Sequence, residues 1–259
     1  MFPSFVSKPF HFGEDAPNNV PLFLTPLIEA GRLEEARRAS KVSLPPGSPD
    51  VISHAGYLTV NAADCGSNMF FWYFPAKFPK KSVNDSNPTL LWLQGGPGGT
   101  SLFGLFAEHG PLVVTKEMKV EERLTAWTLT HNVVYIDNPV GTGYSFTKED
   151  SCYAKDQKDV ARDLYQALQQ FFTVFPHLRT GSEFYVTGES YAGKYVPAIS
   201  YKIHQEMQAL KQKDPQNYKK DKHFINFRGM AIGDGLCDPV TMTNYGDFLY
   251  NIGLIDEQV

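Results

Sequence analysis

Four short apolar runs, each followed closely by glycine or proline, divide the central part of the chain. Runs this short and this continuous predict strands that are buried on both faces of a sheet. Two earlier β-rich runs, joined by a segment with Gly, Asn and Asp, predict an antiparallel hairpin. The central runs are residues 89–93, 133–137, 184–187 and 229–232, and the hairpin runs are residues 56–60 and 68–74.

Apolar residues recur at helical spacing between the second and third central runs. They include Val160, Leu164, Phe171 and Phe175, and Pro176 follows the last turn. This pattern predicts an amphipathic helix, and a second helix is predicted from about residue 190 to 210. Strands that alternate with helices indicate an α/β fold, with a mostly parallel sheet, helices on both faces and an antiparallel N-terminal edge.

The composition is that of a folded globular protein. Of the 259 residues, 42% are hydrophobic and 20% are charged, and this length allows one large domain or two small ones. The net charge is −4 and there is no dense stripe of Lys and Arg, which argues against a nucleic-acid partner. No apolar run reaches the roughly 18 residues needed to cross a bilayer. The N-terminal stretch has no clear signal-peptide core.

Three cysteines, Cys65, Cys152 and Cys237, have no metal-ligand spacing. One disulfide with one free thiol, or three free thiols, both remain open. Asn84 begins an N-glycosylation sequon, Asn-Asp-Ser, which supports a secretory route only weakly because such triplets are common. We expect no cofactor and no metal ion.

The segment from Gly188 to Gly193 carries the strongest chemical signal. A β-run leads into Gly-Glu-Ser-Tyr-Ala-Gly, with Ser190 in the middle, and a predicted helix follows. This is the pattern of a nucleophile elbow, a strained turn that exposes the serine hydroxyl at the carboxyl end of a sheet. The strict pattern has glycine where Ala192 stands, which is one methyl group larger. The alternative is an ordinary strand–turn–helix with Ser190 as the helix N-cap.

A second motif follows the predicted strand 89–93, which opens into the glycine-rich loop Gln-Gly-Gly-Pro-Gly-Gly from Gln94. In folds with a nucleophile elbow, one oxyanion donor is the N–H after the nucleophile, and another comes from a glycine loop after an earlier strand. We therefore predict that Tyr191 and Gly96 are the two donors. A plain turn built from Gly and Pro is the alternative for this loop.

Taken with two further segments, these motifs resemble serine carboxypeptidases, and among them the vitellogenic-like branch. The further segments are Glu-His-Gly-Pro from Glu108 and Val-Tyr-Ile-Asp-Asn-Pro-Val-Gly-Thr-Gly-Tyr-Ser from Val134, and the match is collinear from about Pro21 to Val259. The resemblance implies an α/β-hydrolase fold with a helical cap, endosomal, lysosomal or secreted residence, and removal of single residues from peptide or protein C-termini. It divides the chain into an arm at 1–20, part of the hydrolase domain at 21–240, and the start of the cap at 241–259.

The resemblance also implies a group that holds the terminal carboxylate of the substrate. The family more often has Asn in place of the glutamine of this group, whose longer arm would shift recognition, and Cys where Gly99 stands, so that family disulfide cannot form. The implied residues are Gln94, Gly95, Glu108 and Glu189.

Two glutamates beside an anionic substrate would repel it unless at least one is protonated. A shared buried site raises one carboxyl pKa, so we expect carboxylate binding to strengthen as the pH falls from neutral toward about 5. Without the resemblance, Glu108 is typical of a solvated acid at a helix end and Glu189 of a spacer in the elbow.

A serine nucleophile also needs a base and an acid that orients it, and in this fold both follow the serine along the chain. Only His204 and His223 follow Ser190. His204 falls about 20 Å along the predicted helix, and His223 has no suitable acid before it. We therefore expect the triad Asp and His to lie beyond residue 259, and this chain alone to be inactive.

Two other functions stay open. One is a catalytically silent carboxypeptidase-like binding protein that keeps the groove. The other is an esterase, lipase or acyltransferase on the same fold. The carboxylate-holding group argues against the second, because a neutral ester has no terminal anion.

Overall fold

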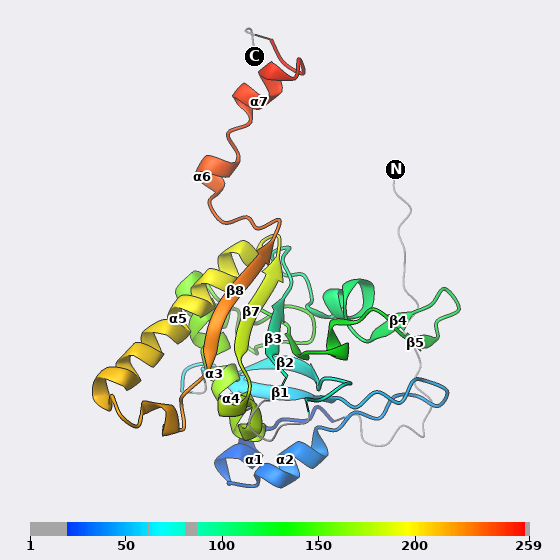
Figure 1. The fold of residues 1–259 in the computed structure, drawn as a ribbon, viewed down its shortest axis with the longest axis vertical. Helices are drawn as coiled ribbons and strands as arrows, with labels where there is room; N and C mark the ends of the chain where they lie inside the picture. Colours follow the sequence, from blue (N-terminus) through cyan, green and yellow to red (C-terminus); the bar gives the residue numbers. More distant parts are fainter. Residues whose placement is uncertain (1–19, 62, 81–86, 257–259) are drawn as a thin grey trace.

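The computed structural model describes residues 20–61, 63–80 and 87–256. Its main sheet has six strands in the order β1-β2-β6-β3-β7-β8 (Figure 1). β1, β2 and β6 pair antiparallel, and β6, β3, β7 and β8 run parallel, which confirms the predicted arrangement. The bounds are His54–Val60 for β1, Ser67–Phe74 for β2, Thr89–Leu93 for β3, Asn132–Ile136 for β6, Phe184–Glu189 for β7 and Phe227–Gly233 for β8.

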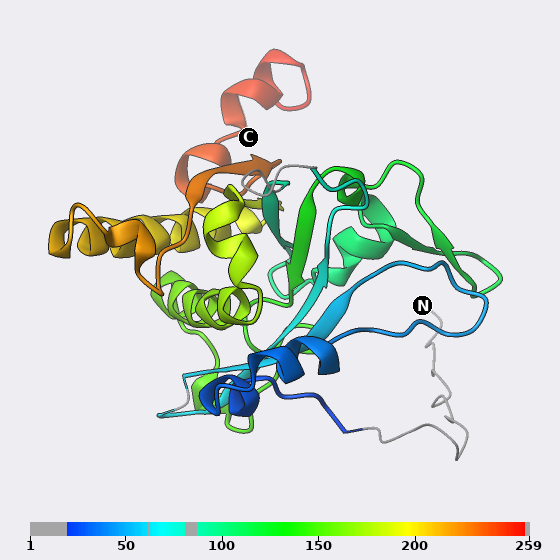
Figure 2. The same cartoon turned by 60° about the horizontal axis from the view of Figure 1, so that its bottom comes forward.

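Two long helices cover one face of the sheet and lie side by side (Figures 1 and 2). They are α3, Gln157–Val174, and α5, Ala192–Lys213, close to the two predicted helices. The apolar side of α3 is buried against β1 and α5, as its helical spacing of apolar residues requires. Three short helices, α1 (Thr25–Glu29), α2 (Leu33–Ala39) and α4 (Pro176–Gly181), pack against α3.

The opposite face is covered mainly by the segment between β3 and β6 (green in Figure 2). The predicted helices on this face are reduced to a π-helical turn, η1 (Gly104–Glu108), and a 3₁₀ turn, η2 (Trp127–Leu129), beside the hairpin β4 (Leu112–Val114) and β5 (Val120–Glu122). After η1 the chain folds back closely on itself at Gly110, where an added Cβ would fall 2.2 Å from the Leu105 carbonyl oxygen, so only glycine fits there.

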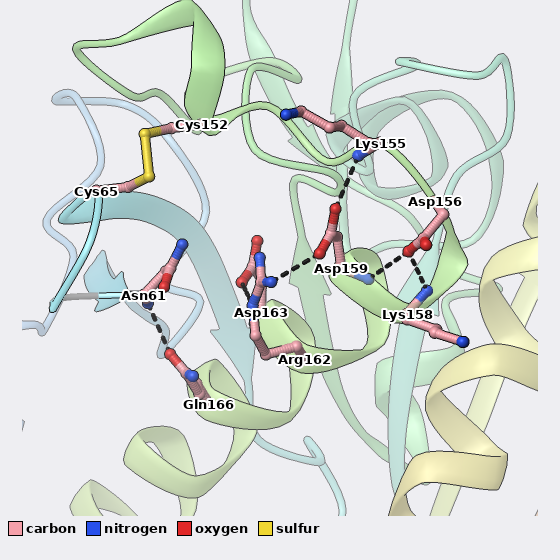
Figure 3. Close-up of polar contacts among 10 residues, drawn as sticks. All are labelled: Asn61, Cys65, Cys152, Lys155, Asp156, Lys158, Asp159, Arg162, Asp163 and Gln166. Atoms are coloured by element: carbon pink, nitrogen blue, oxygen red, sulfur yellow. Dashed lines mark hydrogen bonds and ion pairs between the residues drawn. A yellow bond between two sulfur atoms is a disulfide. The ribbon is translucent and has the colours of Figure 1, made fainter.

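A disulfide joins the turn after β1 to the segment that leads into α3 (Figure 3). It pairs Cys65 with Cys152 and leaves Cys237 free and exposed, which decides between the two alternatives that the sequence left open. The N-terminus of α3 is fixed nearby by Asp156, whose carboxylate accepts the N–H groups of Lys158 and Asp159. This is an N-cap.

Beyond β8 the chain leaves the sheet, and α6 (Pro239–Met242) and α7 (Gly246–Asn251) extend away from it (Figure 1). Their apolar side chains are exposed, with Val240 at 85% and Phe248 at 60%. The start of a cap at 241–259 remains a prediction. Residues 1–19 of the predicted arm, and the sequon residue Asn84, lie outside the described residues. None of the described helices is both long and apolar enough to cross a membrane.

Candidate functional site

The segment around Ser190 forms a strained turn between β7 and α5. Ser190 has a φ of 57°, a left-handed conformation that costs a non-glycine residue on the order of 1–3 kcal/mol. The turn is held from β8, because Ser190 N–H donates to the Gly233 carbonyl at 3.0 Å. A Cβ at Gly188 would lie 2.7 Å from the Ala192 Cβ, which explains why both residues are small. This geometry is that of the predicted elbow.

The glycine-rich loop after β3 packs directly against this turn. A Cβ at Gly95 would lie 2.6 Å from the Tyr191 nitrogen and 2.8 Å from the Glu189 carbonyl oxygen. Within the part of the chain that is described, the N–H groups of Gly96 and Tyr191 donate to no acceptor, and the Ser190 hydroxyl has no hydrogen-bond partner. The two predicted oxyanion donors therefore lie on segments in contact, with amides free to receive a negative oxygen.

Asp137, directly after β6, anchors the other end of the loop. Its Oδ1 accepts the Thr100 hydroxyl at 2.6 Å and the Ser101 N–H at 2.9 Å, and its Oδ2 accepts the Tyr144 N–H at 2.8 Å. Burial raises the pKa of Asp137, while these hydrogen bonds oppose the rise. Sequence reasoning assigned no role to Asp137. Its signal was an acid placed directly after a buried strand, at the edge of the sheet where the elbow lies.

Gln94 and Glu189 are joined by a short hydrogen bond. Gln94 Nε2 donates to Glu189 Oε1 at 2.6 Å, and Gln94 Oε1 accepts the Trp92 Nε1–H at 3.0 Å. The indole can only donate, so it fixes which end of the Gln94 amide faces Glu189. Trp92 is a further residue whose role sequence reasoning missed.

Glu108, the last residue of η1, completes this group. The pKa of Glu108 is raised to about 7 by burial first, and then by a hydrogen bond to Glu189 and by the charge of Glu189. A raised pKa on one of the two carboxyls is the direction expected from the sequence when two glutamates share a buried site. The structure thus brings Gln94, Gly95, Glu108 and Glu189 to the same edge of the sheet as Ser190.

An open cavity of about 460 Å³ lies beside this group, between the ends of β7 and β8 and the turn at Trp127. Aromatic and aliphatic side chains form most of its wall, and the two glutamates supply its charge. The lining residues include Trp92, Glu108, His109, Trp127, Glu189 and Ile232. An apolar cavity with a few converging polar groups is typical of a small-molecule or peptide-end site.

Neither histidine that follows Ser190 reaches it. His204 lies exposed in the fourth turn of α5, and His223 lies exposed in the connection before β8. No described histidine forms a hydrogen bond with Ser190. Among the described residues no group of three or more His, Cys, Asp or Glu side chains is arranged to hold a metal ion, so we assign no metal ligands.

Comparison with known proteins gives a consistent result. The family model for serine carboxypeptidases matches residues 45–259. The chain is 52% identical to the Homo sapiens protein named "Probable serine carboxypeptidase CPVL", over 92% of this chain and 46% of that protein. It is 46% identical to the vitellogenic carboxypeptidase of Aedes aegypti, over 91% of this chain and 46% of that protein.

Among solved structures, the chain is similar to Kex1, a prohormone-processing carboxypeptidase from Saccharomyces cerevisiae. The TM-score is 0.70 at 27% identity, covering 85% of this chain and 48% of that one. The chain therefore has an α/β-hydrolase fold, and it spans about half the length of the curated relatives that it matches. The chain belongs to the serine carboxypeptidase family.

Proposed function

We propose that this chain provides the nucleophile, the oxyanion hole and the carboxylate-holding group of a serine carboxypeptidase that removes residues from peptide or protein C-termini. One observation carries the proposal. A serine on a strained turn lies beside free backbone amides, and a Gln–Glu–Glu group lies at the same edge of the sheet. The first feature suits acyl transfer, and the second suits a terminal carboxylate.

In the proposed reaction, Ser190 Oγ attacks the carbonyl carbon of the last peptide bond. The oxygen of that carbonyl becomes negative and accepts hydrogen bonds from the N–H groups of Gly96 and Tyr191. The C–N bond then breaks, the C-terminal residue leaves with a proton on its amine, and an acyl-enzyme on Ser190 remains. Water hydrolyses the acyl-enzyme and restores the serine hydroxyl.

The carboxylate of the departing residue is held by the Gln94 amide, the Gly95 N–H and the protonated form of the Glu108–Glu189 pair. A protonated carboxyl donates a hydrogen bond to the substrate carboxylate, whereas an ionised one repels it. The raised pKa of Glu108 supports this assignment, since it keeps a proton on the pair up to about pH 7.

The base and its orienting acid are proposed to lie outside residues 1–259. Two observations support this. Neither His204 nor His223 is placed to take the proton of Ser190, and the chain spans 46% of the relatives with which it aligns. Residues 1–259 alone are then expected to hydrolyse no peptide.

Residence in an oxidising compartment is part of the proposal. The Cys65–Cys152 disulfide supports an endosomal, lysosomal or secreted protein, because such bonds persist in the secretory route and are rare in the cytosol. The substrate partners would be peptide or protein C-termini.

Kinetics of the full-length protein that carries this chain test the proposal. An N-blocked dipeptide with a free carboxylate is compared with its C-terminal amide, and kcat/KM should favour the free acid by about a hundredfold or more, as for loss of a group that a polar site is built to bind. Ser190→Ala should lower kcat by at least about 10⁴-fold. Ser200→Ala, on the buried side of α5, is the matched control.

The two rival functions give different results. A silent binding protein would bind the free acid but show no turnover that depends on Ser190. An esterase or acyltransferase would use the amide or an ester as readily as the acid. Either outcome would overturn the proposal.

A further inference from the structure

His109 lies behind the carboxylate-holding group in a cage of aromatic rings. Its imidazole stacks on Trp127 with ring centres 4.0 Å apart and meets the edge of Trp92 at 4.2 Å. The backbone closes the cage, because Trp127 N–H donates to the His109 carbonyl at 2.9 Å. The residue is 8% exposed, so each ring nitrogen needs a partner within the protein.

One ring nitrogen has such a partner. His109 Nδ1 lies 3.2 Å from the Tyr135 hydroxyl. That hydroxyl is fully buried and makes no other hydrogen bond to a described residue, and burial raises the pKa of Tyr135, so it keeps its proton. A buried phenol donates to an available acceptor. Tyr135 therefore donates to Nδ1, and the proton of the neutral imidazole sits on Nε2.

The other ring nitrogen faces Glu108. Nε2 lies 3.9 Å from Glu108 Oε2, and both atoms are buried without a hydrogen-bond partner among the described residues. This gap is about 1 Å longer than a hydrogen bond. A buried donor and a buried acceptor that both lack a hydrogen bond are costly. The cost is relieved if the two side chains move closer and Nε2–H donates to Oε2.

The charged groups around the two side chains favour a neutral His109. Arg123 holds the carbonyls of Phe106 and Gly110 with its guanidinium, and its charge adds to burial in lowering the pKa of His109 to about 4. On the other side, Glu189 and Asp234 face Glu108 and add to burial in raising its pKa. Tyr135 is the remaining titratable group beside them in the described part of the chain: its hydroxyl lies 3.2 Å from His109 Nδ1, and the charge of Glu108 adds to burial in raising its pKa.

We propose that His109 is a positioning residue for Glu108, presenting Nε2–H to Oε2 and so setting the pH range over which the Glu108–Glu189 pair holds a substrate carboxylate. An N–H that faces Oε2 makes it the acceptor oxygen, which leaves the carboxyl proton on Oε1. The same donor stabilises the ionised form of Glu108 and so lowers its pKa, against burial and Glu189. The inference rests on the proposed function, since it concerns how that site handles its ligand.

Side-chain replacements can separate the two ring nitrogens. Glutamine places an amide N–H near the position of Nε2, whereas asparagine places one near Nδ1 and phenylalanine keeps only the ring. Binding is measured in the full-length Ser190→Ala protein, which cannot turn the ligand over. The probes are an N-blocked dipeptide acid and its amide, and dissociation constants are measured by calorimetry from about pH 4.5 to 8, across the range set by the pair.

The reference protein, which is full-length Ser190→Ala with no other change, should bind the dipeptide acid more tightly as the pH falls. His109→Phe and His109→Asn should move the midpoint of this profile upward by about one pH unit, the loss of one hydrogen bond to a charged group. His109→Gln should leave the midpoint near that of the reference. Tyr135→Phe frees Nδ1 and lets the imidazole take either tautomer, so it should move the midpoint upward by less than His109→Phe does. If the His109 variants do not fold, Tyr135→Phe serves as the test.

The outcomes are distinguishable. If the acid is bound preferentially with a pH midpoint that no His109 or Tyr135 variant moves, or that the Gln and Asn variants move alike, the role of His109 is refuted while the proposed function stands. If the reference protein binds acid and amide equally at every pH, the proposed function itself fails.

Discussion

At the scale of single residues, the candidate site contains a carboxyl group that holds its proton near neutral pH. Glu108 has a pKa of about 7 in the folded chain, compared with an ordinary value of 4.5. The causes are burial and Glu189, so the shift belongs to the pair as much as to Glu108 itself. The upward shift of the Glu108 pKa suits an anionic ligand, because a protonated carboxyl does not repel an anion, and it would disfavour a cationic ligand.

The raised pKa also has a consequence for stability. Between about pH 4.5 and 7, Glu108 keeps its proton in the folded protein but has lost it in the unfolded chain. The contribution of this proton to the free energy of unfolding is therefore full below 4.5 and is lost as the pH rises through 7. In Glu108→Gln it is absent. The melting temperature of the native protein minus that of Glu108→Gln should therefore fall between about pH 5 and 7.5. Glu121→Gln, on the exposed hairpin, controls for loss of a carboxylate elsewhere, and a constant difference for Glu108→Gln would contradict the assignment.

The sequence predicted the elbow serine and its neighbours, and the structure brings them together. The sequence did not reveal three residues that position other residues of the site. They are Trp92, Asp137 and His109. Trp92 orients Gln94 two residues along the same strand, and Asp137 reaches the loop because β6 lies next to β3. Such roles depend on which strands are neighbours, and apolar periodicity does not specify strand order.

At the scale of elements, the six strands and two long helices follow directly from the pattern of apolar residues. Helix α2 and the hairpin β4–β5 were not predicted, because little of either is buried. In α2 only Ala36 is buried, so there is no apolar stripe, although the acids in its first turn and the arginines in its last are a helix signal. The hairpin strands have three residues each, and two of the three residues of β5 are glutamates, Glu121 and Glu122, so the strand has no apolar run.

The contact between the glycine loop and the elbow gives a second prediction. Gly95→Ala would place a Cβ 2.6 Å from the Tyr191 nitrogen, which real structures do not tolerate, so the loop must move away from Ser190. In the full-length protein, displacing the proposed oxyanion donor should lower kcat by about 10²–10³-fold. Gly229→Ala is the control, because its Cβ would meet only the Tyr185 ring, at 3.7 Å. Wild-type kcat in a folded Gly95→Ala protein would show that the two segments are not held as described.

At the scale of the whole molecule, the sheet separates two cores of different kinds. The face under α3 and α5 is a continuous aliphatic and aromatic core, whereas the opposite face packs irregular segments on Trp92 and Tyr135. Ser190, Gln94 and Glu189 lie where the ends of β3 and β7 meet the irregular side. The layered sheet and helices therefore position the loops of the candidate site, as in other α/β folds.

The Cys65–Cys152 disulfide closes a loop that includes β2, β3 and β6, with a sequence separation of 87. In the chain-entropy model, a loop of this length stabilises the folded state by about 4–5 kcal/mol. Replacing both cysteines with Ala should lower the free energy of unfolding, measured in urea, by about that amount. Cys237→Ala, at an exposed free thiol, should change it by less than about 0.5 kcal/mol. Equal effects of the two replacements would contradict the pairing.

The reactivity of Ser190 shows most directly whether its hydroxyl is exposed and activated at the strained turn. The full-length protein that carries this chain is treated with an organophosphonate that modifies activated serines, and the adduct is located by mass spectrometry of its peptides. We predict one adduct, on Ser190, which is lost in Ser190→Ala and forms more slowly in Gly95→Ala. An unmodified Ser190 in a protein that hydrolyses peptides, or an adduct on a different serine, would contradict it.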